Sequence, residues 1–303
     1  MVSRVVGFSK IKAFYSKTLE HGGLLHAYLF TGQEQIGKRL FALELAEELT
    51  GSTALRLYSS IASPDVLIVD PADSESGHSI SITEIRKIKN FLTLHAQGLR
   101  KVVIINDAHT MTDEAQNGLL KMLEEPSPTT VFIFVTAYRD QLLPTVLSRC
   151  QEVAFPDHPR ASFEKIWGDA KLSDAQKDFL FAFSHGRLGL VIDILKNNSI
   201  GDIKKSAEEF SNLVAADLND RFVMARELAE PRHSGRGPDT GSSGEKDHAI
   251  LNTKVLYWML YMGTRPRDQK NSRVLRGLLT LHTVLSQPQY NTQMALEEFF
   301  LKL

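Results

Sequence analysis

Hydrophobic positions in the first half of the chain follow two alternating patterns. Short continuous apolar runs, which predict buried strands, cover residues 26–30, 66–69, 102–105 and 131–135. Apolar residues three and four positions apart predict helices over residues 8–21, 38–49, 82–92 and 113–123. Ser81 and Glu84 form a capping-box pattern at the start of the third helix. Strands and helices in this order favour a parallel α/β sheet.

The strand pattern ends near Phe155-Pro156, and the rest of the chain is predicted to be helical. Residues 161–199 hold two or three short helical segments, one of them starting at Ser173, and helices continue from residue 203. Residues 73–79 are polar and predict a loop. Residues 231–247 are rich in Gly, Ser and Pro, lack apolar residues and predict a flexible loop. We therefore expect three domains, 1–157, 158–202 and 203–303.

Composition excludes several classes of protein. The chain has 303 residues, with Lys+Arg 35 against Asp+Glu 36, so no overall positive field favours nucleic acid. Cys150 is the one cysteine, which excludes an internal disulfide and a zinc site of several cysteines. The first ten residues lack a continuous apolar core, and the apolar stretch 255–262 is too short to span a bilayer. We expect a cytoplasmic protein.

Residues 32–39 carry the pattern G-x-x-x-x-G-K between a predicted strand and a predicted helix. In such a loop, Gly32 and Gly37 let backbone N–H groups turn toward phosphate oxygens, and Lys38 reaches the terminal phosphates. The next position needs Ser or Thr to ligate magnesium, but here it is Arg39. The alternative interpretation is a Gly-rich turn without a ligand.

A second site feature follows the strand 102–105. An ATPase of this class needs acidic residues at a strand end to hold magnesium and to orient water. Here the metal-holding position is the neutral Asn106, and Asp107 is one methylene shorter than the usual Glu. Together with Arg39, these departures predict that the chain lacks efficient magnesium chemistry of its own, although Asn and Asp are also common in ordinary turns.

Two motifs carry a resemblance to a known family. Residues 117–126 read Asn-Gly-Leu-Leu-Lys-Met-Leu-Glu-Glu-Pro, and residues 143–150 read Leu-Pro-Thr-Val-Leu-Ser-Arg-Cys. Together they resemble the clamp-loader branch of the AAA+ ATPases. The resemblance implies an α/β AAA+ P-loop core (1–157) with a parallel sheet, a small helical lid (158–202) and an all-α collar domain (203–303).

The resemblance also implies a function and partners. It implies a subunit of the clamp loader of bacterial DNA polymerase III, next to gamma/tau and delta subunits, acting on the sliding clamp and primed DNA through the complex. ATP or ADP would be bound without efficient hydrolysis. Residues 50–65 hold no cysteine, so the four-cysteine zinc module of gamma/tau is missing. The alternative is a catalytically active gamma/tau-type ATPase.

The resemblance assigns roles to individual residues. It implies that Arg149 reaches the ATP of a neighbouring subunit, and that Thr136 is a polar sensor beside Gly32, Gly37, Lys38 and Asp107. The lid arginine of gamma/tau corresponds to Gly189. Arg187 lies two residues earlier and would point elsewhere on a helix.

Two basic clusters could contact phosphates or be solvated helix faces. They are Arg86, Lys87 and Lys89 with Arg100 and Lys101, and Arg265, Arg267, Lys270, Arg273 and Arg276. The lone Cys150 is expected to pack as a small buried side chain.

Overall fold

The structure, a computed structural model, describes residues 5–51, 64–71, 79–94, 96, 98–168, 172–197, 199–229, 243–266, 268–285 and 291–303. Nearly all of the predicted loop 73–79, residues 231–242 of the second predicted loop, and Arg267 lie outside the described residues. Contacts divide the chain into two compact units. The first holds the sheet and residues 186–190, and the second holds the helices of the C-terminal half. The predicted division into three domains stays a prediction.

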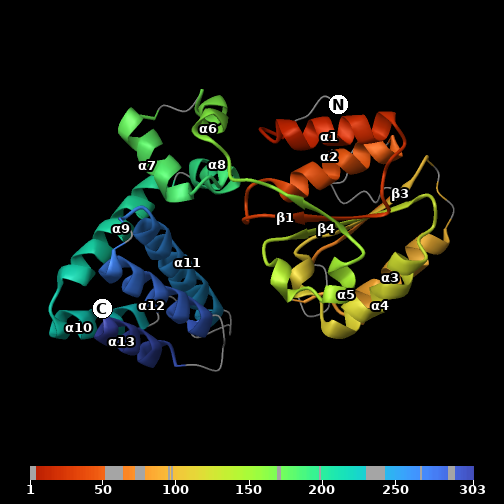
Figure 1. Ribbon diagram of the computed structural model, residues 1–303. Helices are drawn as coiled ribbons and strands as arrows, with labels where there is room; N and C mark the ends of the chain where they lie inside the picture. Colours follow the sequence, from red (N-terminus) through yellow and green to blue (C-terminus); the bar gives the residue numbers. More distant parts are fainter. Residues whose placement is uncertain are drawn as a thin grey trace. The chain divides into compact units, whose positions relative to one another are not determined.

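The first unit is built on a five-stranded parallel sheet in the order β2-β3-β4-β1-β5 (Figure 1). The strands are β1 (Ala27–Thr31), β2 (Val66–Val69), β3 (Lys101–Ile105), β4 (Thr130–Thr136) and β5 (Gln151–Ala154). The four predicted strands are confirmed. β5 was missed because it is a largely exposed edge strand, whose sequence Gln-Glu-Val-Ala carries no apolar run.

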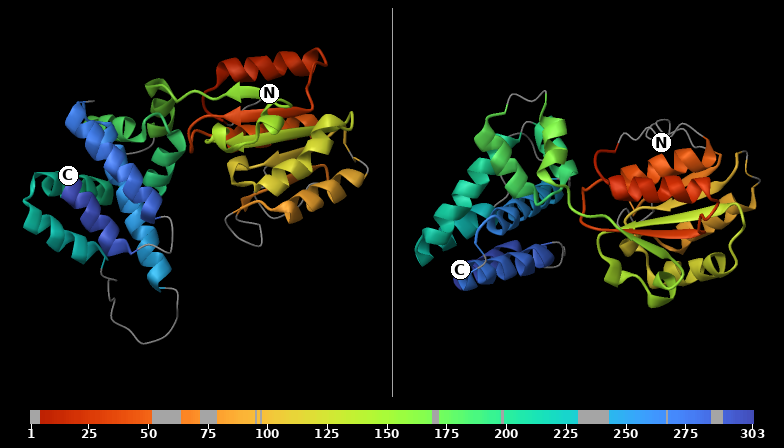
Figure 2. Two further views of the ribbon diagram at one scale, coloured as in Figure 1. Left: turned by 60° about the horizontal axis from the view of Figure 1, so that its bottom comes forward. Right: turned by 45° about the horizontal axis from the view of Figure 1, so that its top comes forward.

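Helices cover both faces of the sheet (Figures 1 and 2). On one face, α1 (Ser9–Glu20) and α2 (Lys38–Thr50) pack on Tyr28 and Phe30 of β1. On the other, α3 (Ile82–Thr93) and α4 (Asp113–Glu124) pack against the face that carries Leu29. Successive strand residues therefore enter opposite cores, which explains the continuous apolar runs.

Local sequence accounts for the start of α3 and its packing. The Ser81 hydroxyl accepts a hydrogen bond from the Thr83 N–H, and the Glu84 carboxylate accepts one from the Ser81 N–H, so the predicted capping box is confirmed. A Cβ at Gly118 of α4 would lie 2.7 Å from Ile82 Cδ1. The glycine therefore allows α4 to pack closely on α3.

Short elements complete the first unit. They are the 3₁₀ turns η3 (Ala108–Thr110) and η4 (Arg139–Gln141), α5 (Pro144–Leu147) and α6 (Arg160–Trp167). Residues 186–190, which include the first turn of α8 (Leu188–Lys196), also belong to this unit. The segment 161–199 thus contains three helices, α6, α7 (Asp174–Ser184) and α8, as the pattern predicts.

The second unit is helical throughout its described part. Besides α7 and most of α8 it holds α9 (Ile200–Ala215), α10 (Leu218–Ala229), α11 (Ser243–Gly263), α12 (Gln269–Leu285) and α13 (Thr292–Lys302). Its core includes the rings of Phe210 and Trp258, stacked with centroids 4.9 Å apart.

The helix α11 begins at Ser243, so the prediction of a loop over residues 231–247 was wrong for its last five residues. The charged residues 245–247 tolerate a helix that is anchored by the buried side chains of its later turns. Within the described residues, no helix is long and apolar enough to cross a membrane.

Candidate functional site

The predicted phosphate loop connects β1 to α2 and has the backbone that such a loop needs. Gly32, Gln35 and Gly37 all have positive φ, at 140°, 57° and 103°. A Cβ at Gly32 would lie 2.5 Å from the carbonyl oxygen of Phe155, so only glycine fits there. Gly37 is the residue that caps the N-terminus of α2. Loop and helix N-terminus together can accept a phosphate group.

Lys38 is turned toward its own loop. Its Nζ donates hydrogen bonds to the carbonyl oxygens of Gly32 (2.7 Å) and Gln33 (2.5 Å). The side chain is buried, and burial lowers the pKa of Lys38 to about 8, against the attraction of Glu34 and Asp107. The lysine still lies where it can meet a phosphate, but its donors are engaged by the loop.

The two positions expected to serve magnesium make protein contacts instead. Arg39 forms an ion pair with Asp70 at the end of β2, with Nη2 2.7 Å from Oδ2. Asn106 donates a hydrogen bond from Nδ2 to Oδ2 of Asp107 at 3.0 Å. A guanidinium cannot ligate a cation, and the Asn106 amide offers only a neutral oxygen as a ligand. The loop geometry therefore fits a phosphate, and Arg39 and Asn106 offer poorer magnesium ligands than a hydroxyl and a carboxylate would.

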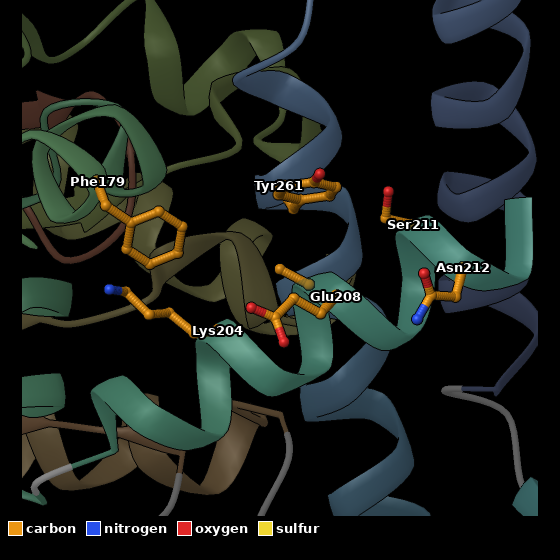
Figure 3. A pocket seen from close by; sticks show the side chains of 7 residues that line it. Phe179, Lys204, Glu208, Ser211, Asn212 and Tyr261 are labelled. Carbon is orange, nitrogen blue, oxygen red and sulfur yellow. The ribbon is translucent and has the colours of Figure 1, made fainter. Parts of the chain in front are cut away.

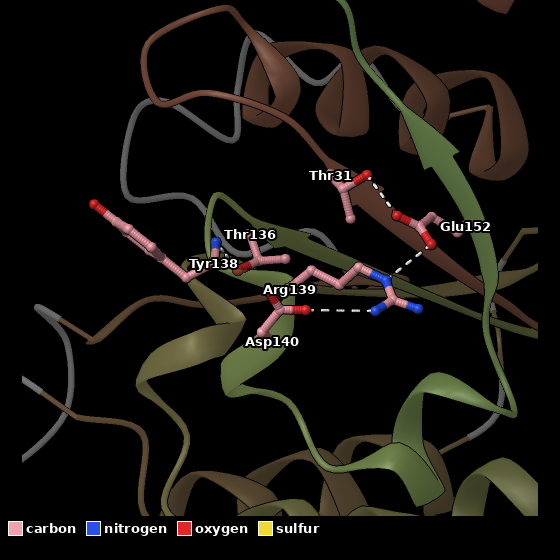
Figure 4. A network of polar contacts seen from close by, with 6 residues as sticks. All are labelled: Thr31, Thr136, Tyr138, Arg139, Asp140 and Glu152. Carbon is pink, nitrogen blue, oxygen red and sulfur yellow. Dashed lines mark hydrogen bonds and ion pairs between the residues drawn. The ribbon is translucent and has the colours of Figure 1, made fainter.

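Asp107 and Thr136 meet at the edge that also carries the phosphate loop. Ile105 pairs with Phe134 and Thr31 pairs with Thr136, so the carboxyl ends of β1, β3 and β4 are level. The Thr136 hydroxyl accepts a hydrogen bond from the Tyr138 N–H at 3.0 Å. Figure 4 shows this contact beside a second one in which Glu152 joins Thr31 (3.0 Å) to Arg139 (3.0 Å). Polar groups from several strands thus gather at this edge.

His109 was not singled out from the sequence. Its Nδ1 lies 3.2 Å from the Thr136 hydroxyl, and its ring is 4.8 Å from that of Tyr138. Burial raises the pKa of Asp107, although His109 opposes the shift, and burial lowers the pKa of His109. Asp107 also adopts a left-handed backbone (φ 46°), which Asp tolerates better than most residues.

Glu34 and Arg187 are further residues that sequence reasoning did not place at the site. Burial lowers the pKa of Arg187, while the charges of Glu34 and Asp157 oppose that shift. The negative charge of Glu34 also acts on Tyr138, Lys38 and Asp107. Arg187 precedes α8 rather than lying within it, so the expectation that it points elsewhere on a helix was wrong. Its proximity to the loop depends on the chain path between α7 and α8, which no local pattern reveals.

Gly189 contacts the phosphate loop through its backbone. Its N–H donates a hydrogen bond to the carbonyl oxygen of Gln35 at 2.7 Å, and a Cβ would lie 2.5 Å from that oxygen. Position 189, to which the resemblance assigns a lid arginine in gamma/tau, therefore has no room for a side chain here.

Arg149 lies at the opposite edge of the sheet from the loop. β1 and β5 are parallel and Thr31 pairs with Ala154, so Gly32 is level with Phe155. Arg149 lies two residues before the first residue of β5, and the four steps from Gln151 to Phe155 alone span about 13 Å at about 3.3 Å per strand residue. Its guanidinium pairs with Glu124, Nη2 to Oε1 2.6 Å. The structure thus brings together Gly32, Gly37, Lys38, Asp107 and Thr136, and separates Arg149 from them.

The basic clusters lose one member to the core. Lys101 is 2% exposed, donates a hydrogen bond to the carbonyl oxygen of Phe91 at 2.5 Å and lies over its ring. Its inclusion in a phosphate-contacting cluster was therefore wrong, because β3 turns it inward. Arg86, Lys87 and Lys89 are exposed, and Lys87 pairs with Glu84 at 3.5 Å.

Burial raises the pKa of Cys150 to about 12, consistent with a packing role.

The second unit carries a groove of about 560 Å³ (Figure 3). Its lining comes from α7, α9 and α11 and consists of Phe179, Lys204, Ala207, Glu208, Ser211, Asn212 and Tyr261. Lys204 lies 5.7 Å from the centre of the Phe179 ring, and Glu208 offers the opposite charge nearby. The lining carries both charges and therefore favours neither an anionic nor a cationic ligand.

Across the residues that the structure describes, no group of three or more His, Cys, Asp or Glu could hold a metal ion.

Comparisons with known proteins agree with this architecture. Residues 8–159 match the family described as DNA polymerase III, delta subunit. The chain is 35% identical over 167 residues to DNA polymerase III subunit delta' of Pseudomonas aeruginosa, covering 51% of this chain and 50% of the relative. It is 34% identical over 168 residues to the Bacillus subtilis subunit delta', covering 52% and 50%. The match thus spans about half the length of these curated relatives.

A solved structure extends the likeness of the fold. The gamma subunit-related protein of DNA polymerase III from Thermotoga maritima superposes with a TM-score of 0.55 at 19% identity, covering 94% of this chain and 97% of that chain. The predicted fold, an α/β core with a parallel sheet followed by helices, is confirmed. Since the family match covers half of the sequence, including the phosphate loop and both motifs, this chain belongs to the DNA polymerase III, delta subunit family.

Proposed function

We propose that this chain is a delta-prime-type clamp-loader subunit of bacterial DNA polymerase III. In this proposal it keeps a degenerate nucleotide site and supplies Arg149 to the ATP of a neighbouring gamma/tau subunit, while the complex loads the sliding clamp onto primed DNA. Family membership and the names of the relatives support the assignment to DNA polymerase III.

One observation carries the role of Arg149, namely its separation from the chain's own phosphate loop. The loop follows the carboxyl end of β1, whereas Arg149 precedes the amino end of the parallel β5. An arginine in that place cannot serve the nucleotide of its own loop. A guanidinium stays charged at all relevant pH values and can clamp a phosphoryl group of a neighbour in a forked geometry.

The chain's own site would contribute little hydrolysis. The backbone N–H groups of the loop and Lys38 would hold ATP or ADP. The negatively charged phosphates of the nucleotide suit this loop geometry. Arg39 and Asn106 occupy the positions of the magnesium-binding groups, and both are engaged by neighbouring carboxylates. The composition of residues 50–65, which lack cysteine, supports a chain that needs no zinc.

The remaining parts follow from the same proposal. The core (1–157), lid (158–202) and collar (203–303) form three domains, and the collar joins this chain to delta and gamma/tau neighbours in the cytoplasm. The nearly neutral chain, at net charge -1, fits a subunit that acts mainly through protein contacts and meets DNA through the complex.

The test is a complex reconstituted with gamma/tau and delta subunits, in which clamp- and DNA-stimulated ATP hydrolysis is measured. We expect Arg149→Ala to lower the rate by about 1,000-fold without preventing assembly, because arginines in this role supply 10³–10⁵ in rate. Arg139→Ala is the control, since Arg139 is also surface-exposed and pairs with a glutamate, Glu152, as well as with Asp140. We expect it to change the rate by less than about twofold.

The alternative is a gamma/tau-type motor. If the isolated chain hydrolyses ATP briskly, and Lys38→Ala abolishes that activity, the alternative holds and the proposal is wrong. Equal rates for wild type and Arg149→Ala in the assembled complex would also contradict it.

A further inference from the structure

The two motifs that identify the family meet in space at a single ion pair. Glu124 is the last residue of α4, within the first motif, and Arg149 stands between α5 and β5, within the second. Twenty-five positions of sequence separate them, yet Glu124 Oε1 and Arg149 Nη2 are 2.6 Å apart. This distance is that of a short charge-assisted hydrogen bond.

Two further contacts hold the same guanidinium. Arg149 Nη1 donates hydrogen bonds to the carbonyl oxygen of Thr145 (2.8 Å) and to the hydroxyl of Ser148 (3.2 Å). A guanidinium has five N–H donors, so within the described structure these contacts use three and leave two for another acceptor. The Arg149 side chain is 33% exposed, so the guanidinium is held without being buried.

The three contacts differ in what they can do. Thr145 and Ser148 precede Arg149 in the same local turn and restrain only one end of the guanidinium. Glu124 comes from a different helix and provides the one negative charge among the three partners. An arginine on the surface otherwise loses substantial rotamer entropy when it is fixed, and a partner that fixes it beforehand removes that cost from the reaction.

We propose that Glu124 is a positioning residue for Arg149. Its carboxylate fixes Nη2, and two N–H donors remain for a phosphate of the neighbouring subunit. The inference rests on the proposed function, because it gives Glu124 a task only if Arg149 acts on another subunit. The proposal explains why the acidic pair Glu124-Glu125 occurs together with the Ser-Arg-Cys segment. Of the two glutamates, it gives the positioning role to Glu124 and none to Glu125.

The test uses the reconstituted complex and compares Glu124→Ala with Glu125→Ala. Both glutamates are exposed and adjacent, but the ion pair involves Glu124. We expect Glu124→Ala to lower kcat about tenfold while the KM for ATP stays within about twofold, as loss of one hydrogen bond to a charged group predicts. Glu124→Gln keeps a hydrogen-bond acceptor and should recover about half of the loss on a logarithmic scale. Glu125→Ala should match wild type.

The double variant separates positioning from an independent effect. In the Arg149→Ala background, Glu124→Ala should have no further effect, because the group that it positions is gone. Additive losses, a faster rate for Glu124→Ala, or equal losses for Glu124→Ala and Glu125→Ala would overturn the inference. If Arg149→Ala itself leaves the rate unchanged, the proposed function fails. If Arg149→Ala slows the complex but Glu124→Ala does not, only the role of Glu124 fails.

Discussion

Arg139 and Arg149 lie at opposite edges of one sheet in similar chemical surroundings. Arg139 pairs with Glu152 at 3.0 Å beside the carboxyl ends of the strands, and Arg149 pairs with Glu124 at 2.6 Å near their amino ends. Their side chains are 46% and 33% exposed. Arg139 also pairs with Asp140 at 3.6 Å, but residue type and pairing with a glutamate do not by themselves distinguish the two arginines. Their place in the parallel sheet does, because it decides whether an arginine can face this chain's own phosphate loop or another subunit.

The charges around the loop differ from those near Arg149 in one further respect. At the loop edge, Lys38 and Arg39 are engaged by carbonyl oxygens and by Asp70. At the other edge, Arg149 keeps two N–H donors beyond its contacts within the described residues. Lys38 and Arg39 therefore contact acceptors beside the phosphate loop, whereas Arg149 lies two residues before β5, at the other end of the strands. This difference is what the following predictions test.

Replacing Arg149 by lysine gives the largest expected effect. Lys keeps the positive charge but loses the forked donors, so we expect the reconstituted complex to retain less than about a tenth of the wild-type ATPase rate. The same exchange at Arg139 should change the rate by less than about twofold. Stimulated ATP hydrolysis checks both. A lysine that restores full activity would show that charge alone matters at position 149.

Gly189→Ala tests how closely α8 approaches the loop. Its Cβ would lie 2.5 Å from the Gln35 carbonyl oxygen, so we expect a loss of about 1–3 kcal/mol in the free energy of unfolding. Gly201, in the first turn of α9, meets nothing within 4 Å. Gly201→Ala should therefore stabilise by up to about 1 kcal/mol. Urea unfolding checks the pair, and equal stabilities would contradict the close approach.

The lowered pKa of Lys38 predicts a pH dependence of stability. Burial lowers its pKa from 10.5 to about 8, so between these values the unfolded chain binds more protons than the folded one. The contribution of Lys38 to the free energy of unfolding therefore rises with pH across this window. We expect the stability of wild type relative to Lys38→Met to increase from pH 8 to pH 10.5, as measured by urea unfolding. Parallel pH curves for the two proteins would contradict a buried, shifted lysine.

Magnesium removal gives the smallest expected effect. Because Arg39 and Asn106 stand at the magnesium-binding positions, we expect the affinity of the isolated chain for ATP to change by less than about twofold on adding EDTA. Fluorescence anisotropy with a labelled ATP analogue measures this. A drop of tenfold or more would show that another group supplies the missing ligand.

Much of the fold was predictable because its determinants are local. The strand β4 follows from one continuous apolar run, and the start of α3 follows from Ser81 and Glu84, which lie three residues apart. β5 was missed because an exposed edge strand needs no apolar residues. Lys101 was placed on the surface because its charge hides that it is the first residue of a buried strand.

In the candidate site, too, the residues that lie close together in the sequence were predictable, and those brought together from distant segments were not. Gly32, Gly37 and Lys38 are adjacent in sequence, so their spacing alone indicates a phosphate loop. Glu34 lies within that loop, but its influence on Tyr138 and Arg187 depends on residues more than 100 positions away.

The sequence by itself determined that this chain has an α/β core with a phosphate loop, altered magnesium positions and the Ser-Arg-Cys motif, since each is a matter of residue type at short spacing. Only the tertiary structure decided that Arg149 lies at the far edge from that loop, that Glu124 holds it, and that Gly189 is closed against Gln35. These facts depend on the register of parallel strands and on the path of distant segments, which short-range patterns do not encode.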